Sequence, residues 1–134
     1  MAHELNSIML YIHPLLAVLG HVLVFASLYP SLCRKTGKLG RAIPLISWLF
    51  VLSGLVSGMV WAQLAWGAYW SWDPKETATL LLFAGVSAHA HLFYRSHGNP
   101  ASRKAILVLS ALNCTLALAA VLVTWLAEGL HSYT

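Results

Sequence analysis

The chain has 134 residues, of which 59% are hydrophobic and 9% charged, and its formal net charge is +4. A soluble domain carries roughly a quarter of charged residues. The composition therefore excludes an ordinary soluble protein and indicates an integral membrane protein.

Four apolar segments follow one another along the chain, at approximately residues 7–33, 43–65, 74–95 and 104–127. A bilayer core of about 30 Å needs roughly 17–25 helical residues, and each segment is long enough. We predict an all-α, integral membrane four-helix bundle, with residues 1–134 forming a single membrane domain.

Prolines mark both ends of the first segment. Pro14 suits the first position of a helix, which predicts a helix start near His13. An earlier start near Ser7 would instead place a proline kink inside the helix. Tyr29 and Pro30 mark the region where this helix ends.

The charged residues are sorted by the side of the membrane on which they fall. The basic residues of the first and third loops are Arg34, Lys35, Lys38, Arg41, Arg95, Arg103 and Lys104, and only Lys75 lies elsewhere. All four acidic residues fall on the opposite side. By the positive-inside rule the basic loops face the cytoplasm, and both termini face the periplasmic, outer side. This sorting favours a lipid bilayer as the partner of the positive charge and excludes nucleic acid.

The second apolar segment contains two glycines four residues apart, Gly54 and Gly58. Small residues at this spacing let helix backbones approach closely in lipid. We interpret the pair as a packing signal.

The third helix begins within the sequence WGAYWSWDPKET, residues 66–77. Asp73 can cap the helix, Pro74 suits its first turn, and Glu76 follows three residues after Asp73. This pattern predicts a capping box with negative charge at the positive end of the helix dipole. Helix capping does not need the tryptophans of the same stretch.

Four aromatic residues lie within seven positions here: Trp66, Tyr69, Trp70 and Trp72. Tryptophan and tyrosine are enriched at membrane surfaces, so an interfacial belt is one interpretation. A shelf for a large flat ligand such as a porphyrin is the other, since aromatic rings offer wide contact area and offset stacking. The aromatic residues alone leave both open.

Two histidines favour the porphyrin. His13 lies at the outer end of the first predicted helix, and His131 lies just past the outer end of the fourth. Neutral imidazole is a common axial ligand of haem iron. Either histidine alone could be a polar residue at the membrane surface, but the pair flanks the aromatic shelf. We therefore predict one non-covalent haem b, with His13 and His131 as its axial ligands.

Other histidines lie within the membrane segments. His91 follows Asp73 by 18 residues, which is about 27 Å along a helix, so it cannot share the outer iron. His89 points to nearly the opposite face of the same helix, and His21 lies inside the first helix. Ionisable groups in a membrane segment are functional candidates. A second haem held by His91, or by His89 with His21, and interhelical hydrogen bonding stay open as alternatives.

The stretch WGAYWSWDPKET resembles the tryptophan-rich WWD motif of the haem-handling, cytochrome c assembly family, in its CcsA/ResC branch. The preceding SGMVWAQLAWG and the closing GLHSY are also similar to that branch. The resemblance implies a periplasmic haem that lies against the WWD segment, Asp73 included, between His13 and His131. It also matches His91 to a membrane histidine that holds a second haem.

Members of this family are longer, so the resemblance implies that the chain corresponds to a four-helix core. The ligand that would pair with His91 comes from a region outside this core. His21 is a candidate substitute without a motif behind it.

The resemblance implies delivery of haem to c-type apocytochromes and its attachment there, with thioether bonds forming between haem vinyl groups and cysteine thiols. The chain would be part of a haem-ligation (synthase) system and would supply orientation rather than a nucleophile. The expected partners are other membrane subunits and a periplasmic c-type cytochrome or apocytochrome. The expected location is a bacterial inner (cytoplasmic) membrane or a thylakoid-type membrane.

Two other functions stay open from the residues. A core that keeps a bis-histidine haem could be a b-type cytochrome, an electron-transfer subunit of a larger membrane redox complex. A haem-free assembly subunit is the third hypothesis, although the presence of both His13 and His131 argues against it.

Overall fold

In a computed structural model of the chain, the described backbone covers residues 7–33, 36–96 and 98–130, with side chains described as far as residue 126. The helices are α1 (Met9–Ala26), α2 (Leu28–Leu32), α3 (Lys38–Trp66), α4 (Pro74–Ser96) and α5 (Pro100–Leu130). The predicted all-α fold is confirmed for these residues.

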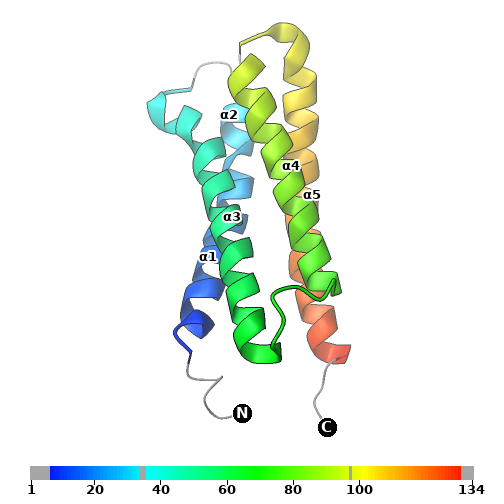
Figure 1. The fold of residues 1–134 in the computed structure, drawn as a ribbon. Coiled ribbons are helices and arrows are strands. Elements are labelled where there is room, and N and C mark those ends of the chain that lie inside the picture. Colours follow the sequence, from blue (N-terminus) through cyan, green and yellow to red (C-terminus); the bar gives the residue numbers. More distant parts are fainter. Residues whose placement is uncertain (1–6, 34–35, 97, 131–134) are drawn as a thin grey trace.

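Four helical stretches are long and apolar enough to cross a bilayer: Met9–Leu32, Lys38–Trp66, Pro74–Ser96 and Pro100–Leu126. They run up and down beside one another in a single bundle (Figure 1). The start of α1, the connection between α3 and α4, and the end of α5 share one end of the bundle, which we call the tryptophan end. The opposite end carries Lys38, Arg41, Arg95 and Arg103, and we call it the basic end.

The first span differs from the prediction at its start. Its helix begins at Met9 and contains Pro14, so the predicted start near His13 is wrong and the earlier start near Ser7 is correct. The Ser7 hydroxyl oxygen accepts a hydrogen bond of 3.2 Å from the Met9 N–H. Such a bond satisfies one of the amide groups that are unpaired in the first turn. The helix therefore begins before the proline.

The same span is interrupted at Ser27, between α1 and α2. The Ser27 hydroxyl donates to the Leu23 carbonyl at 2.9 Å, and the Ser31 hydroxyl donates to the Ser27 carbonyl at 2.8 Å. Hydroxyl bonds to the carbonyl four residues earlier often bend helices. The interruption therefore has a local cause in the serine pattern.

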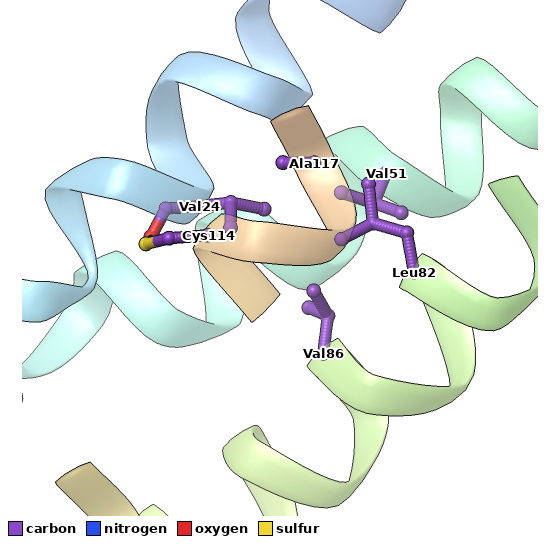
Figure 2. Packing of buried hydrophobic residues seen from close by; sticks show 6 residues of the cluster. All are labelled: Val24, Val51, Leu82, Val86, Cys114 and Ala117. Carbon is purple, nitrogen blue, oxygen red and sulfur yellow. The ribbon is translucent and has the colours of Figure 1, made fainter. Parts of the chain in front are cut away.

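A small apolar core joins all four spans. It consists of Val24, Val51, Leu82, Val86, Cys114 and Ala117 (Figure 2). In lipid, close packing rather than water exclusion drives helix association. Gly20 and Gly54 provide such packing between α1 and α3, because a Cβ on Gly20 would lie 3.2 Å from the Val51 nitrogen and one on Gly54 would lie 3.3 Å from the Ala17 Cα.

At the basic end, the Tyr94 hydroxyl of α4 bonds two backbone groups of α3. It donates to the Arg41 carbonyl at 2.6 Å and accepts from the Leu45 N–H at 3.3 Å. These two backbone groups pair directly in a regular α-helix. Pro44, which has no N–H of its own, lies beside this contact, and helices are commonly distorted at such sites.

Candidate functional site

The path of the chain at the tryptophan end depends on how α3 ends. Gly67 adopts a left-handed φ of 77°, and its N–H bonds the Gln63 carbonyl at 3.0 Å. A glycine in this conformation is a common helix C-cap, since it carries no Cβ. The chain then turns back along the bundle before α4 begins (Figure 1). The tryptophan segment, residues 66–73, is therefore folded against the bundle.

The start of α4 is the predicted capping box. Asp73 Oδ1 accepts from the Glu76 N–H at 2.8 Å, and Glu76 Oε2 accepts from the Asp73 N–H at 3.3 Å. The same Oε2 also accepts from the Ser71 N–H at 2.7 Å, which the sequence analysis did not predict. Glu76 therefore fixes the backbone on both sides of Trp72.

The aromatic rings of the segment pack edge to face and stay open on the outside. The centroids of Trp70 and Trp72 are 5.5 Å apart, and those of Trp61 and Trp66 are 5.2 Å apart, each pair nearly perpendicular. The exposed fractions are 56% for Trp66, 57% for Tyr69 and 70% for Trp72. Trp61 lies outside the segment and extends the aromatic surface along α3.

Trp72 has an unusual backbone conformation, with φ at 60°. Left-handed φ values are uncommon outside glycine and cost roughly 1–2 kcal/mol. Such strain persists only where the surrounding structure holds it, and it is concentrated at functional sites. Here the two Glu76 bonds on either side of Trp72 hold it.

His13 lies at the contact of α1 with α3. Its Nδ1 is 3.1 Å from the Gly54 carbonyl oxygen and 3.3 Å from the Ser57 hydroxyl oxygen. A Cβ built on Gly58 would lie 2.9 Å from His13 Cε1, so the ring rests against this glycine. Gly58 precedes Trp66 by eight residues, or about 12 Å of helix. His13 is therefore tied to α3 inside the bundle, and it is not merely a polar side chain at the membrane surface.

The second expected iron ligand, His131, lies outside the described residues. The helix that leads to it, α5, ends at the tryptophan end (Figure 1). The pairing of His131 with His13 stays a prediction.

His89 is engaged between helices. It is 2% exposed, and its Nε2 lies 3.0 Å from the Ser31 hydroxyl oxygen on α2. This is the interhelical hydrogen bond that the sequence left open as an alternative. Ser31 follows His21 by ten residues, about 15 Å of helix rise. The structure therefore does not bring His89 and His21 together.

His21 bonds within its own helix. Its Nδ1 is 2.7 Å from the Ala17 carbonyl oxygen, and its Nε2 is buried without a hydrogen-bond partner in the described part of the chain. No contact that the structure describes links it to His91.

His91 is exposed and lines a shallow groove between α3 and α4, near the basic end. Its neighbours there include Trp48, Tyr94 and Arg95. Within the described ranges, no three His, Cys, Asp or Glu side chains gather closely enough to hold a metal ion. No second histidine is among the described residues that line this groove.

One known protein family matches nearly the whole chain. The family model described as "Cytochrome C assembly protein" matches residues 1–131. "Cytochrome c biogenesis protein CcsA" of Parasynechococcus marenigrum (strain WH8102) is 37% identical over 112 residues, which cover 84% of this chain and 36% of the relative. The protein of the same name from Chlamydomonas reinhardtii is 38% identical over 108 residues, 78% of this chain and 29% of the relative.

A third relative, from Synechococcus sp. (strain CC9605), is 41% identical over 88 residues, 66% of this chain and 28% of its own length. The chain thus spans about a third of the length of these relatives. No solved structure is significantly similar to it.

Proposed function

Because the chain is an integral membrane protein of the cytochrome c assembly family, we propose that it holds a haem b at the tryptophan end and presents it to a c-type apocytochrome. His13 and His131 are the proposed axial ligands. The faces of Trp66, Tyr69 and Trp72 are the proposed contact surface for the porphyrin. The names of the relatives, which refer to cytochrome c biogenesis, support this assignment.

The observation that carries the proposal is the construction of the tryptophan segment. Glu76 holds the backbone of Ser71 and Asp73, and Trp72 is kept in a strained conformation between them. An interfacial belt needs tryptophan side chains at the right depth, but it needs neither a fixed backbone nor a strained residue. A shelf that receives a rigid flat ligand needs both its rings and their orientation fixed beforehand, because preorganisation lowers the entropic cost of binding.

The residues at this end fit a haem. His13 offers a ring nitrogen that accepts no hydrogen bond from the described residues, and the aromatic surface beside the bundle is open. Bound haem supplies two vinyl groups, and each thioether forms when the S–H of an apocytochrome cysteine adds across one of them. The role of this chain is to orient the porphyrin edge toward the thiols and to keep water from its faces. Such proximity effects can lower a barrier by several kcal/mol.

The proposed orientation places the tryptophan end on the periplasmic or lumenal side of a bacterial inner or thylakoid-type membrane. The support is the charge at the other end, where the end regions of α3, α4 and α5 carry Lys38, Arg41, Arg95, Arg103 and Lys104. Such residues mark the cytoplasmic side of membrane proteins. A Ser71→Cys variant should react with a membrane-impermeant maleimide added to intact cells, whereas Ser102→Cys should react only after lysis. The reverse pattern would refute the orientation.

The direct test of function is the haem b content and absorption spectrum of the purified protein, oxidised and dithionite-reduced. We expect a low-spin haem that is lost when His13 or His131 is replaced by alanine. In the wild-type protein this haem should transfer to an apocytochrome peptide with a Cys-x-x-Cys-His sequence. Unchanged haem content and spectrum in both variants would overturn the ligand assignment. A haem that cycles between redox states but stays with the protein would instead support a b-type cytochrome subunit.

A further inference from the structure

Three residues of α3 surround the imidazole of His13: Gly54, Ser57 and Gly58. We refer to them as the histidine cradle. We propose that the cradle locks His13 in the tautomer with its proton on Nδ1 and thereby presents the lone pair of Nε2 to the iron. Ser57 and Gly58 are then positioning residues of the outer haem site. The inference rests on the proposed function, since it concerns the ligand that we assign to that haem.

The tautomer follows from the chemistry of the groups around Nδ1. The Gly54 carbonyl oxygen, at 3.1 Å, can only accept a hydrogen bond, so Nδ1 must donate to it. The Ser57 hydroxyl donates its own proton to the same carbonyl at 3.0 Å. Toward Nδ1, at 3.3 Å, the hydroxyl oxygen is therefore also an acceptor. Both partners of Nδ1 thus require a proton on that nitrogen.

The proton on Nδ1 determines the state of the other ring nitrogen, Nε2. A neutral imidazole with its proton on Nδ1 carries a free lone pair on Nε2. No hydrogen bond to Nε2 of His13 is found in residues 7–33, 36–96 and 98–126. Metal-binding histidines almost always donate their other N–H to a carbonyl, carboxylate or water, which fixes the ring and raises its basicity. The contact of His13 Nδ1 with the Gly54 carbonyl matches this arrangement.

Gly58 controls the position of the ring. A Cβ at this residue would lie 2.9 Å from Cε1 and 3.3 Å from Nδ1 of His13, so any side chain there displaces the imidazole. Gly54 has a different neighbour, because its Cβ would meet the Ala17 backbone. The two glycines, interpreted from the sequence as one packing signal, therefore serve two functions. Gly54 lets α1 and α3 approach, and Gly58 leaves room for the histidine.

The first experiment uses haem-free, full-length protein in detergent with ¹⁵N-labelled histidine. The nitrogen resonances of His13, assigned by comparison with His13→Ala, should show a protonated Nδ1 and an unprotonated Nε2. In Gly58→Ala the displaced ring should lose this single-tautomer pattern, and in Ser57→Ala it should be weakened. A wild-type His13 with its proton on Nε2 would overturn the proposal without reference to haem.

The second experiment is haem titration of the same variants. Loss of a group that orients a metal ligand typically lowers metal affinity 10–100-fold. We expect about a tenfold loss of haem affinity in Ser57→Ala, recovery in Ser57→Thr, and a larger loss in Gly58→Ala. Ser53→Ala is the matched control for the hydroxyl, because Ser53 donates to Leu49 in the same helix and makes no hydrogen bond to His13.

Gly20→Ala is the matched control for the glycine, because its Cβ would press on the α3 backbone near Val51 without touching His13. If Gly20→Ala lowers haem affinity as much as Gly58→Ala does, the effect is one of helix packing and the cradle is refuted. If Ser57→Ala and Gly58→Ala keep the wild-type affinity while His13→Ala loses it, the cradle also fails, but the proposed haem site stands. In this titration, normal haem binding by His13→Ala would count against the proposed haem site itself.

Discussion

Two histidines connect helices in this bundle, and they do so with opposite ring nitrogens. His13, toward the tryptophan end, donates from Nδ1 to the Gly54 carbonyl. His89, toward the basic end, bonds through Nε2 to the hydroxyl of Ser31, which also contacts the Ser27 carbonyl. A serine hydroxyl can donate or accept a hydrogen bond, so this contact engages Nε2 of His89 in either tautomer. One bundle therefore holds two histidines that are bonded across helices through opposite ring nitrogens.

The difference shows what separates a cross-linking histidine from one that is prepared to bind a metal. Both are hydrogen-bonded across helices, so neither burial nor a bond is diagnostic. In His13 the Nε2 nitrogen, at the far end of the ring, makes no hydrogen bond to the described residues. In His89 the same nitrogen makes the bond to Ser31, and the side chain is only 2% exposed. We therefore interpret His89 as a packing residue.

The difference between the two histidines is tested most directly by replacing each of them with alanine. His13→Ala should lose haem at the tryptophan end, with affinity falling by at least the 10–100-fold expected for a disturbed ligand shell. His89→Ala should retain its haem content and lose stability only. Pyridine-haemochrome counts per folded chain measure both. Equal haem loss in the two variants would show that the difference in bonded ring nitrogen does not distinguish a haem ligand from a packing residue.

Glu76→Ala should have the next largest effect, because one carboxylate holds the amides of Ser71 and Asp73. Loss of a capping interaction costs about 1–2 kcal/mol of unfolding free energy. The strained Trp72 should relax, and haem affinity should fall with it. Glu76→Gln, which keeps an acceptor, should be intermediate. Haem titration with denaturant unfolding tests this, and wild-type haem affinity in Glu76→Ala would show that the shelf needs no fixed backbone.

Tyr94→Phe should act on the basic end alone. It removes the hydroxyl that joins the Arg41 carbonyl to the Leu45 N–H, at a cost of about 1 kcal/mol. Amide exchange at Leu45 should accelerate while the haem spectrum stays unchanged. Unaltered exchange at Leu45 would mean that α3 closes its own ladder when the hydroxyl is absent.

The smallest expected effect is the coupling between His89 and Ser31. Hydrogen bonds between membrane helices contribute about 0.6 kcal/mol on average in double-mutant cycles. A cycle of His89→Ala and Ser31→Ala should give a coupling energy of that order and no change in haem affinity. A coupling energy of zero would indicate that the bond is not formed in the membrane, and a change in haem affinity would extend the haem site to the basic end.

The sequence predicts those features that depend on local pattern. The four spans follow from runs of apolar residues, and the capping box of Asp73 and Glu76 follows from their spacing. The start of α1 is not predicted by the preference of proline for the first helical position, because the helix begins at Met9, whose N–H bonds the Ser7 hydroxyl oxygen. The break at Ser27 was missed, since hydroxyl bonds to a helix's own carbonyls leave no trace in hydropathy.

The candidate site was predictable only in part. The tryptophans and His13 are visible in the sequence, but the partners of His13 depend on which faces of α1 and α3 meet. Nothing in the spacing of Gly54 and Gly58 distinguishes a glycine that faces backbone from one that faces a ring. The bond from Ser71 to Glu76 depends on the fold of the loop that connects α3 to α4. These contacts depend on the tertiary structure, so the local pattern of a single sequence does not predict them.

The contact of Tyr94 with α3 has a consequence for the opposite end of the molecule. Glu76 and Tyr94 are 18 residues apart on α4, about 27 Å along its axis, close to the thickness of a bilayer core. Because the hydroxyl bonds two backbone groups one turn apart on α3, α4 cannot slide by a turn without losing both bonds. The length of α4 therefore fixes the distance between this contact and the tryptophan segment.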